Sequence, residues 1–219
     1  MSSDPEAFIR ANTAIGTPSL VHEIKLHLAS EVTPLWHATE ATLEKSQLPP
    51  PYWAFAWPGG QALARHLIDH PALIAGKSVL DIGAGSGLVS IAAKRAGAAR
   101  VTAAEIDAFA IAAIRLNAAL NEVAIEAESR DLIGGESTWD TILVGDMCYE
   151  RPLADRLTTW LRALASRGAT VLLGDPGRAY LPKAGLTEIA RYDVPTSLAL
   201  EDRSLRETVI WQLGGTIAI

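Results

Sequence analysis

Short apolar runs alternate with longer amphipathic segments along most of the chain after Lys77. The runs are dense in Val, Ile, Leu and Ala, as buried strands are, at 78–83, 100–105, 124–129, 141–146 and 169–175. Between them, apolar residues recur at helical spacing in 87–97, 107–121 and 153–166. This alternation indicates an α/β fold, a doubly wound and mostly parallel sheet that helices cover on both faces.

The first sixty residues follow a different pattern. Helical spacing predicts an N-terminal helix over 18–32, carried by Leu20, Val21, Ile24 and Leu28. Pro, Gly and aromatic residues then crowd the stretch 48–60, which is typical of a shaped loop. A second helix is expected directly after it, over 60–74.

Two apolar stretches near the end of the chain, 186–194 and 207–213, are expected to be strands joined by a long loop without a convincing helix. An antiparallel hairpin at one edge is the simplest interpretation, and it brings the expected sheet to seven strands. In the second strand, apolar Val209, Trp211 and Leu213 alternate with polar residues, although Ile210 breaks the alternation. We therefore expect one face of this strand to pack on the core.

Composition narrows the class of protein. The chain has 219 residues, 49% of them hydrophobic, enough to bury one substantial core. Its formal net charge is −6 and no cluster of Lys and Arg is evident, which argues against a protein held on nucleic acid by phosphate contacts.

Cysteine usage and hydropathy bear on the compartment. The one cysteine, Cys148, excludes an internal disulfide framework and a Cys-rich zinc site, and it fits a reducing compartment. The first residues lack the apolar stretch of a secretory signal, and no run approaches the ~18 apolar residues of a membrane span. We therefore expect a cytoplasmic protein that does not contact membranes.

Ligands of an open parallel sheet bind beyond the carboxyl ends of its strands. The first long strand ends at Asp81, and small residues that let a ligand approach the backbone follow it: Gly83, Ala84, Gly85 and Gly87. A dinucleotide site would favour glycine where Leu88 stands, and an acid before the loop is unsuited to a pyrophosphate. Asp81 suits instead the cationic amino acid group of S-adenosylmethionine, which has no phosphate.

Further carboxylates follow the next two strands. Glu105 lies roughly the ~20 residues past the glycines at which an acid receives ribose hydroxyls. Asp107 is better suited to capping the next helix. Asp131 follows the third strand, where an acid can accept from an adenine amino group, and a turn or helix cap is the open alternative. Together with the glycines, these acids predict a nucleoside pocket.

The fourth strand ends at Asp146, beside that pocket, and Tyr149 follows three positions later. Acid-x-x-aromatic is the spacing found where amino groups are methylated. A lysine with a pKa near ~10.4 must lose a proton before it attacks a sulfonium. A carboxylate can orient the amine and help the proton leave, while a ring narrows the channel. A turn acid and a core ring are the alternative, and Cys148 is interpreted as an inert filler.

The runs PYWAFAWPGGQALARHL and GKSVLDIGAGSG, with NAALN, GDMCYE and GDPGR, resemble the lysine methyltransferases of the electron transfer flavoprotein beta subunit. These enzymes form part of the seven-strand class of S-adenosylmethionine-dependent methyltransferases, whose sheet is Rossmann-like. WPGGQAL and GDPGR are the most specific parts of a match that is collinear over most of the chain. We expect a single methyltransferase domain over 1–219, with an N-terminal helix and the aromatic loop in 1–60 and the sheet core in 61–219.

The resemblance implies a protein-lysine methyltransferase that uses S-adenosylmethionine and acts on the electron transfer flavoprotein beta subunit. It implies cofactor contacts from Trp57, from Gly83 to Gly85, from Glu105 and from Trp139. A packing role is the alternative for both tryptophans, and we favour ligand contact only for Trp57. Relatives usually have Asp where Glu105 stands, but the longer acid can still reach a ribose.

Several readings stay open. Base-methylating enzymes commonly have two prolines where Met147 and Cys148 stand, which favours a protein substrate. Bacterial relatives also resemble ribosomal-protein methyltransferases, so a ribosomal protein is a possible substrate. The alternatives are a methyltransferase for a small-molecule amine, a nicotinamide-dependent oxidoreductase and a catalytically inactive binding module.

Two further motifs have no assigned chemistry. The 175–178 segment, DPGR, either shapes the substrate entrance or is a plain turn. His66 and His70 stand four residues apart on one helix, and without a third ligand in view we expect surface residues rather than a metal site.

Overall fold

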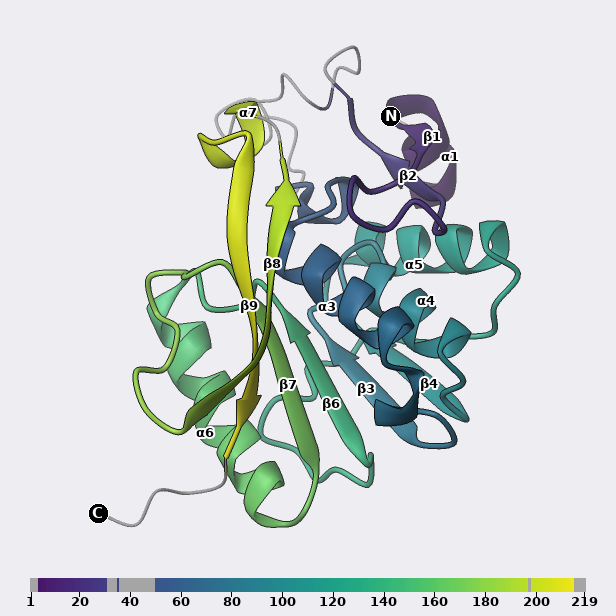
Figure 1. Cartoon of the computed structure of the whole chain (residues 1–219). Helices are drawn as coiled ribbons and strands as arrows, with labels where there is room; N and C mark the ends of the chain where they lie inside the picture. Colours follow the sequence, from purple (N-terminus) through teal and green to yellow (C-terminus); the bar gives the residue numbers. More distant parts are fainter. Residues whose placement is uncertain (1–3, 31–34, 36–49, 197, 215–219) are drawn as a thin grey trace.

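The computed structural model describes residues 4–30, 35, 50–196 and 198–214. Its centre is a seven-stranded sheet in the order β5-β4-β3-β6-β7-β9-β8 (Figure 1). The parallel strands are β3 (Ser78–Ile82), β4 (Arg100–Ala104), β5 (Glu126–Glu128), β6 (Thr141–Gly145) and β7 (Thr170–Asp175). Strand order reverses between β3 and β6, where ligands of such sheets bind. The expected doubly wound parallel sheet is confirmed.

Helices cover both faces of the sheet because its strands carry apolar residues on alternate sides. One face packs against α3 (Pro58–Asp69), α4 (Leu88–Arg95) and α5 (Ala108–Leu120), and the other against α6 (Arg151–Ser166), as Figure 1 shows. Leu143 belongs to the cluster under α3 and α4, whereas its neighbour Ile142 belongs to the cluster under α6. This is the alternation that a strand buried on both sides requires.

The N-terminal helix expected over 18–32 is wrong. The structure has α1 (Pro5–Asn12) earlier in the chain, then β1 (Ala14–Gly16) and β2 (Leu26–Leu28), which form a small antiparallel pair. Residues 31 and 32, like 48 and 49 of the expected loop, lie outside the described residues. The loop after them contains one short 3-10 turn, Tyr52–Ala54, and a second 3-10 turn, Pro71–Leu73, follows α3.

Hydrogen bonds from α5 explain why this segment is extended. The Asn117 side-chain oxygen accepts from the backbone amide of His27 at 2.8 Å. Asn121 accepts from the amide of Lys25 at 3.0 Å and donates to its carbonyl at 2.6 Å. Ile24 and Leu26, two residues apart, are both fully buried. The tertiary contacts of the NAALN motif thus outweigh the helical spacing of the segment.

The expected C-terminal hairpin is confirmed, with one change. It consists of β8 (Leu186–Pro195) and β9 (Leu205–Leu213), but a short helix, α7 (Leu198–Glu201), lies between them. β9 is an inner strand, antiparallel to both β7 and β8. Ile210 packs in the cluster under α3, and Leu213 packs in the cluster under α6. Both faces of β9 are therefore covered, which corrects the expectation of one packed face and explains Ile210.

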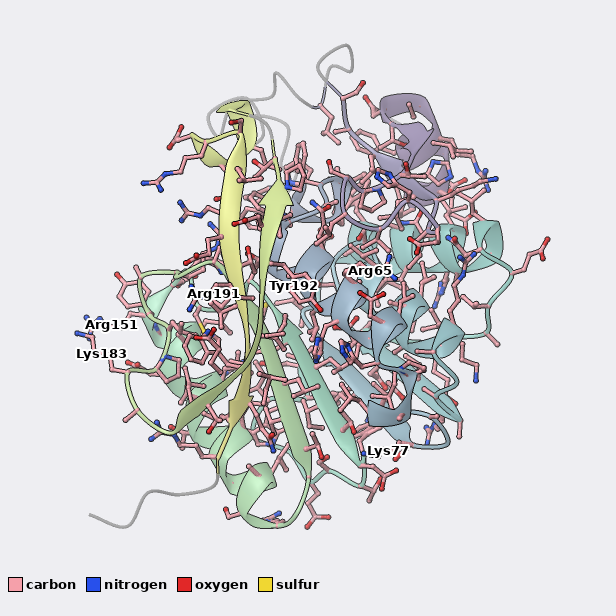
Figure 2. All side chains as sticks on the ribbon, in the orientation of Figure 1. Arg65, Lys77, Arg151, Lys183, Arg191 and Tyr192 are labelled. Carbon is pink, nitrogen blue, oxygen red and sulfur yellow. The ribbon has the colours of Figure 1, made fainter. Side chains whose placement is uncertain are left out.

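His66 is not the surface residue expected from its sequence, because α3 packs against the hairpin. Its side chain is 3% exposed, its Nδ1 lies 3.0 Å from the Tyr192 hydroxyl, and its ring stacks 4.5 Å from that of His70. Figure 2 shows Tyr192 on the hairpin. His70 itself is exposed.

Within the described ranges, no helix combines the length and the apolar character needed to cross a membrane.

Candidate active site

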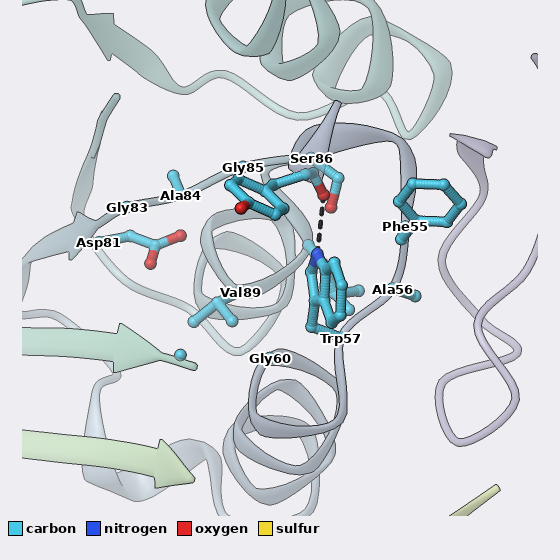
Figure 3. A pocket seen from close by; sticks show the side chains of 13 residues that line it. Phe55, Ala56, Trp57, Gly60, Asp81, Gly83, Ala84, Gly85, Ser86 and Val89 are labelled. Atoms are coloured by element: carbon cyan, nitrogen blue, oxygen red, sulfur yellow. Dashed lines mark hydrogen bonds between the residues drawn. The ribbon is translucent and has the colours of Figure 1, made fainter. Parts of the chain in front are cut away.

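An open cavity lies at the carboxyl ends of β3 and β6 (Figure 3). One wall is an aromatic loop, residues 52–57, which contributes Tyr52, Phe55 and Trp57. The opposite wall is the glycine loop, residues 83–87, together with Asp81 and the start of α4. This is the edge at which the sequence predicted a ligand site.

Glycines are required in the glycine loop by backbone conformation and by space. Gly83, Gly85 and Gly87 all adopt positive φ angles, at 66°, 51° and 80°. A Cβ on Gly83 would also collide with the sulfur of Met147. The amides of Gly83 and Ala84 both donate to the carbonyl of Ala104, at 3.0 and 3.2 Å, which ties the loop to the end of β4.

Asp81 lies at the bottom of the cavity with its charge poorly solvated. It is 1% exposed and accepts a hydrogen bond from the Ser90 hydroxyl at 2.6 Å. Burial raises the pKa of Asp81 to about 7, and the Glu105 carboxylate adds to the increase. A ligand ammonium at this position would supply the missing counter-charge, so the carboxylate fits the cationic group expected from the sequence.

Glu105 lies next to the glycine loop, as expected, but its carboxylate already has backbone partners. One oxygen accepts from the amide of Gly85 at 3.1 Å, and the other from Ile106 at 2.8 Å and Asp107 at 3.4 Å. Burial raises its pKa despite these bonds. A carboxylate has about four acceptor positions, so two ribose hydroxyls would have to displace or share a present bond. Asp107 caps α5 through the amide of Phe109 at 2.8 Å, as predicted.

Asp131 and Trp139 lie away from the cavity lining. The Asp131 carboxylate accepts from the amide of Ile133 at 3.0 Å and pairs with exposed Arg156, as a turn residue does. Trp139 lies just before β6, so it lies toward the amino ends of the parallel strands. Its indole donates to the Thr102 hydroxyl at 3.2 Å. Neither position favours the cofactor contact expected from the sequence.

Trp57 has the position expected of a cofactor contact and also holds its loop together. Its indole Nε1 donates to the Tyr52 carbonyl at 2.8 Å (Figure 3), and its ring lines the cavity. The rings of Tyr52 and Phe55 each lie 6.0 Å from it. The ring of Tyr149 is 5.8 Å from that of Tyr52 and 45% exposed, so it lies at the rim rather than in the core.

Asp146 combines a strained backbone with a buried charge. Its φ angle is +58°, which is unusual for a residue other than glycine, and its side chain is 11% exposed. One carboxylate oxygen accepts from the Gly60 amide, in the first turn of α3, at 3.0 Å. Burial raises the pKa of Asp146 to about 6, although the Arg178 guanidinium and the Gly60 amide both act to lower it.

Arg178 and Glu201 are part of the site, and the sequence analysis did not identify them. The 175–178 segment is a turn in which the Asp175 carboxylate accepts from the amides of Gly177 and Arg178, both at 2.7 Å. The turn directs Arg178 to Asp146, with Nη2 at 2.8 Å from its carboxylate. The specific GDPGR run was a signal for Arg178, but Glu201 stands in no recognisable motif.

Cys148 is the inert filler that the sequence suggested. It is fully enclosed, and burial raises the pKa of its thiol to about 12, so it is not a thiolate at neutral pH. Among the described residues, no group of three or more His, Cys, Asp or Glu side chains could hold a metal ion.

The cavity lining agrees with a cationic, phosphate-free nucleoside ligand. It offers aromatic rings, backbone amides and the Asp81 carboxylate, and none of the described residues that line it is Lys, Arg or His. Phosphates are usually met by such cations, whereas an acid at the bottom would repel them. S-adenosylmethionine fits this set of groups better than a dinucleotide.

Comparison with known proteins finds similarity to methyltransferases. Residues 66–145 match the family model of ribosomal protein L11 methyltransferase. The electron transfer flavoprotein beta subunit lysine methyltransferase of Danio rerio is 41% identical over 95% of this chain and 83% of its own length. The Homo sapiens protein of the same name is 38% identical over 95% of this chain and 82% of its own length.

Solved structures share the fold at lower sequence identity. Magnesium protoporphyrin IX methyltransferase from Synechocystis PCC 6803, with bound S-adenosylmethionine, has a TM-score of 0.54 at 20% identity and covers 72% of this chain and 80% of its own. The ribosomal protein L11 methylase of Lactobacillus delbrueckii has a TM-score of 0.55 at 22% identity, over 74% and 81% of the two chains. The sheet therefore has the fold of the class I methyltransferases.

The two glycines at the start of α3 should respond oppositely to alanine. A Cβ on Gly59 would collide with the Gly174 carbonyl and lie 2.5 Å from the Asp146 carboxylate, whereas a Cβ on Gly60 would meet only Val89, at 3.8 Å. We expect Gly59→Ala to cost about 1–3 kcal/mol or more of unfolding free energy. Gly60→Ala should be neutral or stabilising by up to about 1 kcal/mol. Urea unfolding measures both, and equal losses would contradict the close packing.

Asp81 should make the ligand-free protein less stable as pH rises. Its pKa in the folded protein is about 7, above the ordinary 3.8, so the folded state holds a proton that the unfolded chain releases. The stability that this group contributes is full below the lower value and is lost as pH rises through the upper one. Urea midpoints between pH 5 and 8 should therefore fall less steeply in Asp81→Asn than in the wild type. Equal slopes would show that Asp81 is already ionised.

Proposed function

Since the chain belongs to the electron transfer flavoprotein beta subunit lysine methyltransferases, we propose that it transfers methyl groups from S-adenosylmethionine to lysine side chains of that subunit. The observation that carries the proposal is similarity along nearly the whole chain, which includes the cofactor pocket, Asp146 and the 175–178 turn. The geometry agrees, because a buried acid and an exposed ring stand directly beyond a pocket fit for this cofactor.

In the proposed complex, each residue of the pocket contacts a different part of the cofactor. Asp81 accepts from the ammonium of its amino acid part, and the backbone of Gly83 to Gly85 lies along it. Glu105 accepts from the ribose diol, and the Trp57 ring covers the cavity. When bound, S-adenosylmethionine supplies a methyl group made reactive by a sulfonium. The aromatic loop and the glycine loop, which form the two walls of the cavity, would shield a cofactor held between them from water.

On the acceptor side, Asp146 is proposed to receive the lysine. A lysine arrives as an ammonium, since its pKa is about 10.4, and the carboxylate attracts it and fixes its direction. The amine becomes a nucleophile once its proton leaves. Asp146 would help that proton pass to solvent and would hold the neutral nitrogen toward the methyl group that the cofactor supplies. Asp146 stabilises the positive charge that the nitrogen has before it loses its proton and regains as it is methylated, and Tyr149 narrows the approach.

The electron transfer flavoprotein beta subunit is preferred to a ribosomal protein as substrate for a structural reason. The ribosomal methyltransferase model matches only residues 66–145, which run from α3 to the end of β6. That segment contains the glycine loop and Glu105, so it reports on the cofactor. It does not include Asp146, Arg178 or the hairpin, which face the acceptor.

The single buried cysteine fits a reducing compartment, and we propose the cytoplasm.

The proposal is tested with purified protein, methyl-labelled S-adenosylmethionine and two candidate substrates, the electron transfer flavoprotein beta subunit and ribosomal protein L11. We expect label on lysines of the flavoprotein subunit, identified by mass spectrometry. Label on the ribosomal protein alone would show that the ribosomal protein, and not the flavoprotein subunit, is the substrate. Absence of label from both, together with binding of NADH in preference to S-adenosylhomocysteine, would overturn the activity.

In the same assay, Asp146→Asn should reduce turnover by about 10²–10⁴-fold, because positioned acid–base groups contribute on that scale. Affinity for S-adenosylhomocysteine should change little. Asp69→Asn is the control, since Asp69 is also paired with an arginine, Arg65, but at the far end of α3. Near-normal turnover in Asp146→Asn, or a defect confined to cofactor binding, would remove Asp146 from this role.

Glu105→Ala should weaken binding of S-adenosylhomocysteine by about 2–3 kcal/mol, since the ribose diol loses a charged acceptor. Calorimetry measures the affinity, and thermal unfolding separates it from the loss of the three backbone bonds to this carboxylate. Glu126→Ala, which removes an exposed acid paired with Arg100, is the control. Wild-type affinity in Glu105→Ala would refute the ribose contact.

A further inference from the structure

Arg178 joins two buried acids on the acceptor side of the site. Its Nε and Nη2 both donate to the same oxygen of Asp146, at 3.2 and 2.8 Å. The same guanidinium donates to both oxygens of Glu201, at 2.5 and 3.3 Å. Its side chain is 18% exposed, and Glu201 is 4% exposed. Ion pairs so shielded from water are stronger and more rigid than surface pairs.

Both ends of Arg178 are fixed. Its backbone amide is held by the Asp175 carboxylate, at 2.7 Å. The plane of its guanidinium is held by Glu201 and lies over the ring of Trp57, with 5.7 Å from the guanidinium carbon to the ring centroid. Few other positions are therefore open to the side chain. Asp146, which receives it, is in turn held from the other side by the Gly60 amide.

The charges around Asp146 leave Arg178 as the principal cation that faces it. From β7 and its turn come the Asp175 carboxylate and Arg178, and from α7 comes Glu201. Arg206 of β9 lies behind Glu201, at 3.6 Å from it, and Cys148 and Tyr149 follow Asp146 in its own loop. The first turn of α3 contributes an amide but no ionisable side chain. A carboxylate in such surroundings depends on Arg178 for its charge.

We propose that Arg178 is a positioning residue for methyl transfer: it keeps the Asp146 carboxylate ionised and turned toward the acceptor, and Glu201 holds the guanidinium in place. The proposal rests on the role of Asp146 in the proposed function. A protonated Asp146 would present a neutral group to the substrate ammonium and could not help its proton leave. A freely rotating one would lose the alignment of amine and methyl group that transfer requires.

The opposing effects on Asp146 make this role measurable. Burial raises the pKa of that carboxyl to about 6, and Arg178 is the first of the groups that lower it. Without the guanidinium, burial and the Asp175 charge would act with less opposition, so Asp146 should hold its proton at neutral pH. A loss of packing alone would not move this titration.

The test uses full-length Arg178→Gln and Arg178→Lys, with Arg191→Gln as the matched control. Arg191, labelled in Figure 2, also bridges two acids, Glu188 and Glu207, but it is exposed on β8. The first readout is the titration of the Asp146 carboxyl carbon by ¹³C NMR in aspartate-labelled protein, assigned with Asp146→Asn. The second is the pH profile of kcat/KM for lysine methylation, and the third is affinity for S-adenosylhomocysteine.

In Arg178→Gln, we expect the Asp146 titration to move up by at least about one pH unit, which is a tenfold change in the ratio of its ionised to its protonated form. Because the pKa of Asp146 would move from about 6 to about 7 or above, activity at pH 7 should fall by about twofold or more, and the deficit should shrink as pH rises to 9. Arg178→Lys should restore part of both, because a lysine keeps the charge without the planar fork. Arg191→Gln should match the wild type, and cofactor affinity should stay within about twofold in all variants, since no proposed cofactor contact is lost.

An Asp146 titration that is unchanged in Arg178→Gln would overturn the proposal, as would an activity deficit that is the same at every pH. If Arg178→Gln does not fold, Arg178→Lys must still shift the titration upward, and no shift there would overturn it equally. The NMR titration needs no substrate, so it separates this proposal from the proposed function. Normal methylation by Asp146→Asn would refute the function of that acid even if Arg178 controls its charge.

Discussion

The first turn of α3 lies directly against the ends of β6 and β7, backbone on backbone, and the site depends on that approach. Cβ atoms at Gly59 and Gly174 would each collide with the other residue's carbonyl, and one at Gly145 would lie 3.1 Å from the backbone of Gly60. Three glycines from distant parts of the sequence therefore permit one contact. This contact brings the Gly60 amide to Asp146, and it places Trp57, the residue before the helix, at the cavity. With any larger residue between them, the aromatic wall and the acceptor acid would separate.

That contact also explains why so much buried charge is concentrated at one edge of the sheet. Burial raises the pKa of Asp81, Glu105, Asp146 and Asp175, so each would be easier to bury as an uncharged residue. Asp146 adds a left-handed backbone to the cost. The close packing of the glycines and strands around these acids stabilises the fold and offsets the cost of the site. The buried carboxylates and the left-handed backbone of Asp146 are unfavourable for folding, and they occur at the residues to which chemistry is assigned. Functional sites are where such unfavourable features are expected.

The sequence predicted those parts of the structure in which local pattern and tertiary environment agree. The interior of a buried strand such as Thr141–Gly145 is apolar, and the glycine loop needs left-handed backbone angles that glycine supplies, so the sequence predicted both. The segment 18–32 was misread because the asparagines that hold it extended stand about ninety residues later, on α5. His66 was misread because the hairpin that buries it comes from the other end of the chain. Glu201 could not have been found, since its partnership with Arg178 exists only after the chain has folded.

Asn117 joins two distant parts of the chain through one side chain. Its side-chain oxygen accepts from His27 in β2 while its nitrogen donates to the Ser86 carbonyl in the glycine loop, at 2.8 Å each. An uncharged group that offers a donor and an acceptor from one short plane is available only in asparagine, because aspartate lacks the donor and glutamine is one carbon longer. Replacing Asn117 would therefore break contacts to two distant segments at once. The N-terminal strand pair and the glycine loop therefore depend on the same side chain, so a change that displaces one of them acts on the other.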